Sequence, residues 1–432
     1  MFAKDELMFS CKFSVFVKLA FIAVLGATSL GHAQSLDHMI RQSLQRHPSV
    51  RSQQQQLQAA GTEIEAAKQQ FFPVPSVSVE RVNRGVADPQ YSGDPTVTVF
   101  RLQQPLWTGG RLTAGLDRAR ANEAMFSASL AESRYQLAMR VLSAWGDWYT
   151  ACERIKAHEA SFKTHQRLLM QVERRVNEGA SAESELILTQ GRVAQTVALL
   201  DAARLQHQSA QARLAILTGE TLPQDAWPQE HLRFPRDDLV QYLSLALESS
   251  PALQKVRQQL LLLDADIAEK QSNLYPEVSV RAEHQQGNYS YANLASVNRV
   301  FFSLSSKLGA GTSNWDLLKA AEEKKQALES DFQAQQLALT EQLESDWLQL
   351  RSAQQRYASL QTSLMAARKT AESWDRQFFA GRKTWQEVLN AARELLQAEI
   401  ELTDVMVSQS VFKWRVLLAS QGVDETLSKA LP

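Results

Sequence analysis

The chain has 432 residues, of which 44% are hydrophobic, and its formal net charge is −1 at pH 7. This length exceeds that of most single domains, so two domains or two repeats are expected. The nearly neutral charge gives no reason to expect a nucleic-acid partner. Beyond the N-terminus no apolar run reaches the roughly 18 residues of a transmembrane helix, although a membrane-spanning strand needs only about 9–11 alternating residues.

The first 33 residues are typical of a secretory signal. Lys12 precedes an apolar stretch over residues 19–30, and small residues end the segment at Ala33. A basic region, an apolar core and a small-residue cleavage site, in this order, are the pattern of a signal peptide. We expect the mature chain to begin near Gln34, with a single anchoring helix as the alternative.

Cysteine and histidine form no pattern for catalysis or metal binding. Cys11 leaves with the signal, so Cys152 is the one thiol expected in the mature chain and no intrachain disulfide can form. His158 and His165 are seven positions apart, which is not the spacing of a helical metal pair. The sequence also lacks a phosphate loop of the Gly-x-x-x-x-Gly-Lys type. We therefore expect no enzyme activity, no cofactor and no metal.

The prolines are distributed unevenly along the chain. None occurs between Pro105 and Pro223, and none between Pro276 and Pro432. Because proline costs a helix interior about 3 kcal/mol, gaps of this length mark helices. The prolines themselves mark the turns and strand ends between those helices.

The chain also repeats itself. Pro48 aligns with Pro251 at a shift of 203, and Trp145 aligns with Trp347 at a shift of 202. One change of register over so long an alignment indicates a tandem duplication. We therefore expect two structural repeats, over residues 34–230 and 231–432, after a signal over residues 1–33.

Each repeat is expected to contain the same elements in the same order. The first has a helix over 36–70, a strand pair over 74–106 and a long helical hairpin; the second has a helix over 239–273, a strand pair over 276–308 and a second long hairpin. In the strands, Val278, Val280 and Ala282 alternate with polar residues. Two strands per repeat leave open edges, so we expect a β-barrel completed by other copies; a small soluble sheet packed on helices is the alternative.

The long helices carry apolar residues at a spacing of seven. In the first repeat these are Val141, Trp148, Ile155, Phe162, Leu169 and Val176, and in the second Leu343, Leu350, Tyr357, Leu364, Ala371 and Phe378. A sustained spacing of seven predicts helices packed lengthwise as a left-handed coiled coil. The first long helix, over residues 112–177, would be roughly 100 Å long at 1.5 Å per residue.

A glycine follows the last apolar position of each long helix. Gly179 lies three positions after Val176, and Gly381 lies three positions after Phe378. Glycine just past a helix end favours a left-handed cap, after which the chain reverses. We therefore expect the tips of the two hairpins near residues 179 and 381.

Two stretches resemble a known family, the TolC-type outer-membrane channels of drug efflux and type I protein secretion. "QQPLWTGGRLTAGLDRARA" from Gln103 is similar to the family's approach to its first long helix, and "FFAGRKTWQEVLNAA" from Phe378 is similar to its second hairpin tip. The resemblance covers nearly the whole mature chain, and the duplication, the signal and the strand pairs agree with it. It implies a mainly helical fold with a membrane β-barrel part.

The resemblance also implies an assembly and a role. Three chains would close a twelve-stranded barrel in the outer membrane, and their helical hairpins would form a tunnel, an α-barrel, across the periplasm. The expected partners of this homotrimer are a periplasmic adaptor (membrane fusion protein), an inner-membrane ABC exporter or proton-driven pump, and outer-membrane lipid. The expected role is passive conduction of cargo from the pump to the outside.

Seven residues are singled out by the resemblance. Glu387 and Asn390 stand at the positions of the family's acidic entrance ring, Lys383 and Phe378 stand near its arginine and tyrosine links, and Glu185 on the first tip is the expected acidic partner of Lys383. A phenylalanine cannot make the hydrogen bond of a tyrosine, and a lysine lacks the bidentate fork of an arginine. Gly179 and Gly381 are the candidates for the adaptor contact. A solvated helix face is the alternative for the five entrance residues, and a purely structural role is the alternative for the two glycines.

The cargo is the open choice. The turn "KLGAGTSNWD" from Lys307 is more similar to channels for large secreted proteins, which favours type I protein secretion. Multidrug efflux is the alternative within the same architecture. A periplasmic coiled-coil scaffold without a pore is the alternative of a different class, and it predicts no lipid-facing apolar band.

Overall fold

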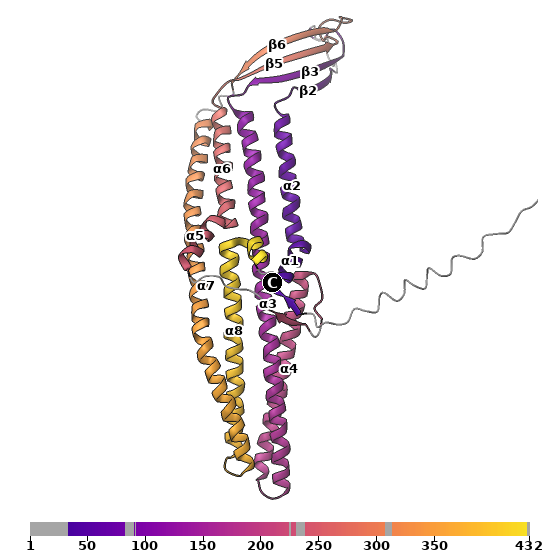
Figure 1. Cartoon of the computed structure of the whole chain (residues 1–432). Helices are drawn as coiled ribbons and strands as arrows, with labels where there is room; N and C mark the ends of the chain where they lie inside the picture. Colours follow the sequence, from indigo (N-terminus) through magenta and orange to yellow (C-terminus); the bar gives the residue numbers. More distant parts are fainter. Residues whose placement is uncertain are drawn as a thin grey trace, which may run out of the picture.

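The computed structural model describes residues 33–82, 90, 92–223, 226–229, 238–306 and 313–429. Residues 1–32 of the expected signal and residues 307–312 of the turn from Lys307 lie outside this described part. Figure 1 shows the helices running side by side along one long axis, with a sheet at one end and two hairpin turns at the other. The ends of this body are therefore two different kinds of structure.

The two halves of the chain contain the same elements in the same order. The first half has α1 (Leu36–Arg46), α2 (Pro48–Gln69), β2 (Val74–Arg81), β3 (Thr96–Trp107), α3 (Arg111–Asn177) and α4 (Glu183–Thr218). The second half has α5 (Leu239–Ser249), α6 (Pro251–Ser272), β5 (Glu277–Gln286), β6 (Val297–Ser305), α7 (Ser313–Phe379) and α8 (Trp385–Lys429). Two short strands, β1 (Ala33–Ser35) and β4 (Trp227–Gln229), pair in parallel beside the helices.

The first helix of each half differs from the sequence expectation. A continuous helix over 36–70 was expected, yet α1 and α2 meet at His47, whose ψ of 130° is extended. The expected helix over 239–273 breaks in the same way at Ser250, with ψ of 118°. The cause is the proline that follows each residue, because proline forces the residue before it out of the helical region. Proline then suits the first position of the next helix, where its missing N–H costs nothing.

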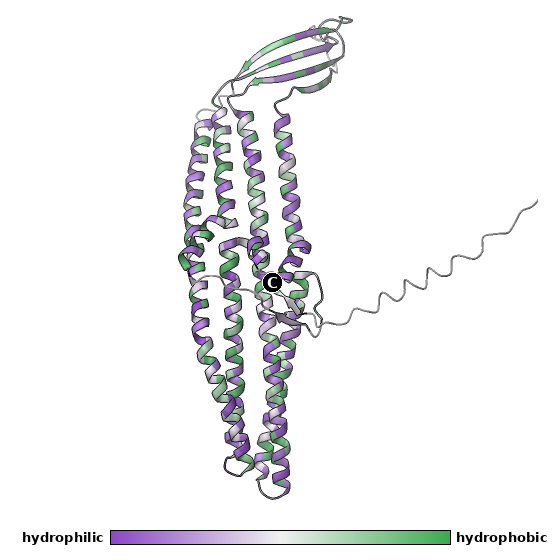
Figure 2. Ribbon diagram, viewed as in Figure 1, coloured by the Kyte–Doolittle hydropathy of each residue, from purple (hydrophilic) through white to green (hydrophobic). Residues whose placement is uncertain are grey.

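The four long strands form one antiparallel sheet in the order β2-β3-β5-β6. Because side chains alternate across a strand, the sheet has two unlike faces. The face that we call the apolar face carries exposed Val77, Val79, Phe100, Leu102, Val300, Phe302 and Leu304. The face that we call the polar face carries Ser76, Ser78, Arg101, Gln103, Ser279, Arg281, Glu283, Gln285 and Arg299. Figure 2 shows the resulting mixture of hydrophobic and hydrophilic residues along these strands.

The main core lies halfway along the helical body. Trp145 and Trp148 of α3 are fully buried there, together with Trp414 of α8 and Leu214 of α4. Helices α1 and α5 also pack on this region. Large apolar side chains dominate burial energetics, so the middle of the body is its most strongly packed part. A second, smaller cluster of buried residues lies near the hairpin turns.

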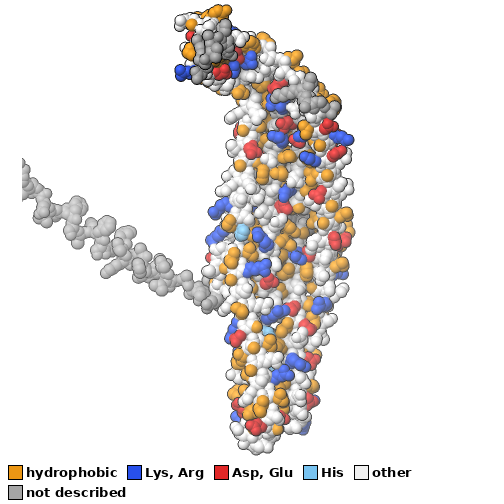
Figure 3. Space-filling view, turned by 180° about the vertical axis from the view of Figure 1, so that it is seen from behind, with side chains coloured by type: hydrophobic (Ala, Val, Ile, Leu, Met, Phe, Trp, Pro, Cys, Tyr) orange, Lys and Arg blue, Asp and Glu red, His pale blue; other side chains and the backbone are white. Residues whose placement is uncertain are grey.

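The surface of the helical body mixes charges of both signs with scattered apolar side chains (Figure 3). Ion pairs tie neighbouring helices together, for example Arg154 of α3 with Asp404 of α8 at 3.0 Å and Arg415 of α8 with Asp346 of α7 at 3.0 Å. Within the described residues, no helix is both long and apolar enough to span a bilayer.

Candidate functional site at the hairpin tips

The turn after α3 is built around Gly179. Its φ is +70°, a left-handed conformation that costs other residues about 1–2 kcal/mol. The amide of Ala180 donates to the carbonyl of Arg175 at 2.7 Å, and the amide of Gly179 donates to Val176 at 3.0 Å. This pair of bonds is a Schellman motif, which satisfies the free carbonyls at the helix end. The chain reverses here and starts α4 at Glu183.

The turn after α7 repeats this geometry. Gly381 also has a φ of +70°, the amide of Arg382 donates to Gln377 at 2.9 Å, and the amide of Gly381 donates to Phe378 at 3.0 Å. A Cβ built on either glycine would meet nothing within 4 Å. The two glycines are therefore required by backbone conformation, and the space around both is open.

At the second tip, the side chains of Lys383, Thr384 and Glu387 form a bonded cluster at the start of α8, which we call the lock. The amide of Thr384 donates to Oε2 of Glu387 at 2.9 Å, and the amide of Glu387 is 3.3 Å from Oγ1 of Thr384. This reciprocal arrangement is a capping box. Lys383 Nζ adds an ion pair to Oε1 of Glu387 at 2.6 Å. The bonds from Lys383 first and Thr384 next lower the pKa of Glu387 to about 2, so its carboxylate stays charged.

This lock changes the expected role of Lys383. The expected link ran from Lys383 to Glu185 on the first tip. In the structure Lys383 pairs with Glu387 of its own hairpin, and its Nζ lies 4.3 Å from the centre of the Trp374 ring. The physical reason is local, because Lys383 lies four positions before Glu387 in the turn that leads into α8, whereas Glu185 belongs to the other hairpin.

Phe378 lies where the two hairpins meet. It is only 4% exposed and packs in a small cluster with Leu168 and Val172 of α3 and with Val388 and Leu389 of α8. The guanidinium of Arg175 lies 5.0 Å from the centre of its ring, within the range of a cation–π contact. Although phenylalanine lacks the hydrogen bond of a tyrosine, this position joins the hairpins by packing.

Asn390 lies on the other side of α8. It lines a hollow of about 250 Å³ that it shares with His165, Arg192 and Arg393. His165 is buried and its Nδ1 lies 2.8 Å from the carbonyl oxygen of Ser161. Burial lowers the pKa of His165, the Ser161 carbonyl opposes this by raising it, and the charge of Arg192 lowers it further. A neutral imidazole is thus held between the hairpins.

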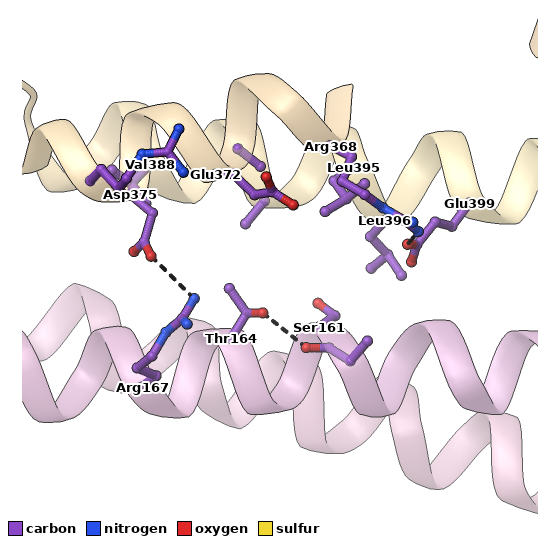
Figure 4. Close-up of a pocket in the computed structure, with 14 residues that line it drawn as sticks. Ser161, Thr164, Arg167, Arg368, Glu372, Asp375, Val388, Leu395, Leu396 and Glu399 are labelled. Carbon is purple, nitrogen blue, oxygen red and sulfur yellow. Dashed lines mark hydrogen bonds and ion pairs between the residues drawn. The ribbon is translucent and has the colours of Figure 1, made fainter. Parts of the chain in front are cut away.

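A groove of about 410 Å³ separates α3 from the second hairpin near the tips. Figure 4 shows Arg167 on α3 and Asp375 on α7 reaching toward each other across it. Their atoms Nη2 and Oδ2 are 3.3 Å apart. On the far side of the groove Arg368 pairs with Glu399 at 3.0 Å. Among the described residues near the tips, the hairpins are therefore joined by an apolar cluster and the Arg167–Asp375 ion pair.

Sequence reasoning missed Arg167, Asp375 and His165. The spacing of seven locates the buried stripe of a helix, but it does not say which helix of the other hairpin faces that stripe. The pairing of Arg167 with Asp375 joins positions 208 apart and has no local signal. Over the described part of the chain, no three His, Cys, Asp or Glu side chains are placed to hold a metal ion.

Comparison with known proteins places this architecture among channels. The sequence family described as "Outer membrane efflux protein" matches residues 39–220 and 242–410. The cobalt-zinc-cadmium resistance protein CzcC of Cupriavidus metallidurans is 26% identical over 310 residues, which cover 71% of this chain and 72% of CzcC.

Solved structures give the same result for the fold. CusC superposes with a TM-score of 0.78 at 16% identity, over 89% of this chain and 91% of CusC. The outer-membrane channel OprN superposes with a TM-score of 0.77 at 20% identity, over 90% of both chains. The outer membrane protein VceC of Vibrio cholerae does so with a TM-score of 0.77 at 16% identity, over 90% of this chain and 96% of VceC. The expected fold class is thereby confirmed.

Proposed function

Because the chain belongs to the outer membrane efflux protein family, we propose that it is the exit duct of a tripartite efflux system for small solutes. The protein is an outer-membrane channel that extends into the periplasm. Cargo is conducted passively, and the driving energy comes from an inner-membrane pump. The features of this chain that support the proposal lie at the two ends of its helical body.

The observation that carries the proposal is the open four-stranded sheet. Among the described residues, its outer strands β2 and β6 each pair along one edge only, and its apolar face is exposed. An open edge and an exposed apolar face are both unfavourable in water. Joining β6 of one copy to β2 of the next removes the edges, and three copies close a twelve-stranded barrel. The apolar face then contacts lipid.

The hairpin tips form the opposite, periplasmic end. They lie at the far end of the helical body from the sheet (Figure 1). With 67 residues in α3, the body between sheet and tip spans roughly 100 Å at 1.5 Å per residue. The open space around Gly179 and Gly381 supports their assignment as the contact for a periplasmic adaptor. An inner-membrane pump, of the ABC or proton-driven class, completes the system.

The entrance itself is assigned to the second tip and its neighbours. Glu387, Asn390, Lys383, Glu185 and Phe378 are the proposed entrance residues. Three copies of Glu387 would attract cations at a narrow opening. The ion pair with Lys383 offsets much of that charge. The proposed ring is therefore weaker than a ring of free carboxylates.

Small solutes are favoured as cargo over proteins. CzcC bears a name that describes metal resistance, which supports a small-solute cargo rather than a protein cargo. The expectation of type I protein secretion depended on the turn from Lys307, and residues 307–312 of that turn lie outside the described part of the chain. Protein export stays a prediction, and neither a protein substrate nor an ABC exporter has further support.

Membrane fractionation with an unboiled gel tests the proposal. We expect an outer-membrane band near three times the mass of the mature chain that dissociates on boiling. A soluble periplasmic monomer would instead support the scaffold and contradict the channel. Deleting the gene separates the cargoes, because loss of small-solute efflux raises sensitivity to metals or drugs, whereas loss of secretion removes a large protein from the medium.

A further inference from the structure

The polar face of the sheet carries an unbalanced group of arginines. Arg101 of β3 stands opposite Glu283 of β5, which stands opposite Arg299 of β6, so the three form one row across the sheet. Arg281 lies on the same face in the neighbouring row. Because the side-chain period of a strand is two, all four side chains share one face. Three arginines and one glutamate thus share the middle of the polar face.

Only two of the three arginines have a nitrogen close to the Glu283 carboxylate. Arg101 Nε donates to Oε1 of Glu283 at 2.8 Å. Arg281 Nε lies 3.0 Å from the same oxygen, but this buried N–H has no aligned acceptor within the part of the chain that the structure describes. Arg299 uses one nitrogen to donate to Oε1 of Gln285, a neutral group, at 3.0 Å. The group therefore retains positive charge and spare donors.

The other described acids of the polar face lie at its two ends and have partners of their own. Glu80 accepts from the hydroxyl of Tyr289 at 3.0 Å near the loops. Glu277 pairs with Arg111 at 2.9 Å at the helical end of the sheet. Neither lies in the two rows that carry the arginines. The middle of the polar face thus has two more positive than negative side chains per chain.

We propose that Arg101, Arg281 and Arg299 form an anion-binding belt inside the outer exit of the channel. This inference rests on the proposed function, because closing the sheet into a trimeric barrel with its apolar face in lipid turns the polar face toward the lumen. Three copies bring nine guanidinium groups around one water-filled passage. A narrow passage focuses their field, and guanidinium groups match the geometry of phosphate and carboxylate.

The belt predicts which class of cargo the exit favours. Small solutes with two or more phosphate or carboxylate groups are attracted to the exit, whereas bare divalent cations are repelled from it. Glu387 at the tips carries the opposite sign, so the two ends of the duct treat charge differently. At 0.1 M salt the field of the belt extends about 10 Å from its charges, so raising the salt concentration shortens its reach.

The test is block of the purified trimer in a planar bilayer. The probe is inositol hexakisphosphate, added either to the barrel side or to the tip side. We expect block from the barrel side that weakens as KCl is raised. The double variant Arg281→Gln/Arg299→Gln should raise the half-blocking concentration about tenfold, because it removes six charges from the passage while Arg101 still pairs with Glu283.

Two matched variants control the experiment. Arg281→Lys/Arg299→Lys keeps the charge and should retain most of the block. Arg81→Gln removes an arginine from the apolar side of β2 and should leave the block unchanged. The single variant Arg299→Gln leaves both contacts of Glu283 in place and serves if the double variant does not assemble on the unboiled gel.

The outcomes separate the two proposals. Equal block of wild type and the glutamine variants, or block from the tip side alone, overturns the belt while the channel stands. Stronger barrel-side block by a polyvalent cation such as hexaamminecobalt also overturns it, since the exit would then favour cations. A wild-type protein that forms neither a trimer nor a conducting pore overturns the proposed function itself.

Discussion

At the first tip the N-cap of α4 is Ala182, which makes no side-chain capping bond, whereas at the second tip Thr384 and Glu387 cap α8 reciprocally. The two positions correspond at the shift of 202, and so do Gly179 and Gly381. The backbone turns share their φ and their hydrogen bonds. The backbone of the turn is therefore the same in both repeats, whereas the side chains around it differ.

The divergence is strongest in the residues that join the hairpins. Phe378 corresponds to Val176, and Lys383 corresponds to Ser181. The second tip holds a lysine–glutamate pair and a buried aromatic ring, and the first hairpin supplies the surface of α3 against which that ring packs. Similar backbones thus serve unlike purposes, because a turn needs only a glycine whereas a contact needs particular side chains.

The largest predicted effect removes the ring that distinguishes the second tip. Phe378→Ala should destabilise the contact between hairpins by about 3 kcal/mol, since the ring is nearly fully buried. The matched change Val176→Ala should cost roughly 1 kcal/mol, because Val176 is half-buried and smaller. Amide hydrogen exchange of the trimer near the tips measures both. Equal losses of stability in the two variants would contradict the prediction that the second tip contributes more to the contact between hairpins.

The next prediction tests what the tips share. Gly179→Ala and Gly381→Ala should each lower the stability of their turn by about 1–2 kcal/mol, and the two losses should be equal. Both residues have a φ of +70°, and the space that an added Cβ would enter is open. Local exchange of the turn amides is the measurement. A bulky residue such as tryptophan at Gly381 should also abolish export while the trimer remains in the membrane. Loss of the trimer would make the glycine purely structural.

A smaller effect comes from exchanging the caps. Thr384→Ala should weaken the first turn of α8 by about 1 kcal/mol. Ala182→Thr should strengthen the first turn of α4 by a similar amount, because Glu185 stands three positions after the cap and can complete a capping box. Amide exchange in each first turn provides the readout. No gain at Ala182→Thr would mean that Glu185 is held elsewhere.

The charges of the second tip give opposite predictions for selectivity. Glu387→Ala should lower the cation preference of single channels, whereas Lys383→Ala should raise it by leaving Glu387 unpaired. Reversal potentials under a salt gradient measure both. Unchanged selectivity in both variants would remove these residues from the entrance.

The smallest predicted effect is a dependence on pH. His165 has a pKa below its usual value because of burial, so the unfolded chain binds its proton more readily than the folded one. Its contribution to stability is therefore present above the unfolded pKa of about 6.5 and is lost as the pH falls toward the lower folded pKa. His165→Ala copies Ala367, the corresponding residue of the second hairpin, and should flatten the stability of the first hairpin between pH 7 and pH 5. An unchanged pH profile would assign that slope to other groups.

Much of the architecture followed from local patterns in the sequence. The long first helix was expected over 112–177 and occupies Arg111–Asn177, because proline-free length and a spacing of seven are strong helix signals. The glycines marked both turns, since few residues besides glycine adopt a positive φ. The helix breaks before Pro48 and Pro251 were not predicted, because the apolar pattern continues across both prolines.

The contacts between hairpins depended on how the helices are placed in space. The pairs Arg167 with Asp375 and Phe378 with Val172 both join residues whose proximity no spacing along the chain encodes. The register of the strands likewise brought Arg101, Arg281 and Arg299 to one face around Glu283. Local signals act within a few residues, so a sequence specifies where its helices, strands and turns begin and end. Which charges then stand together is set by packing between segments some 200 positions apart, where only the folded chain supplies the geometry.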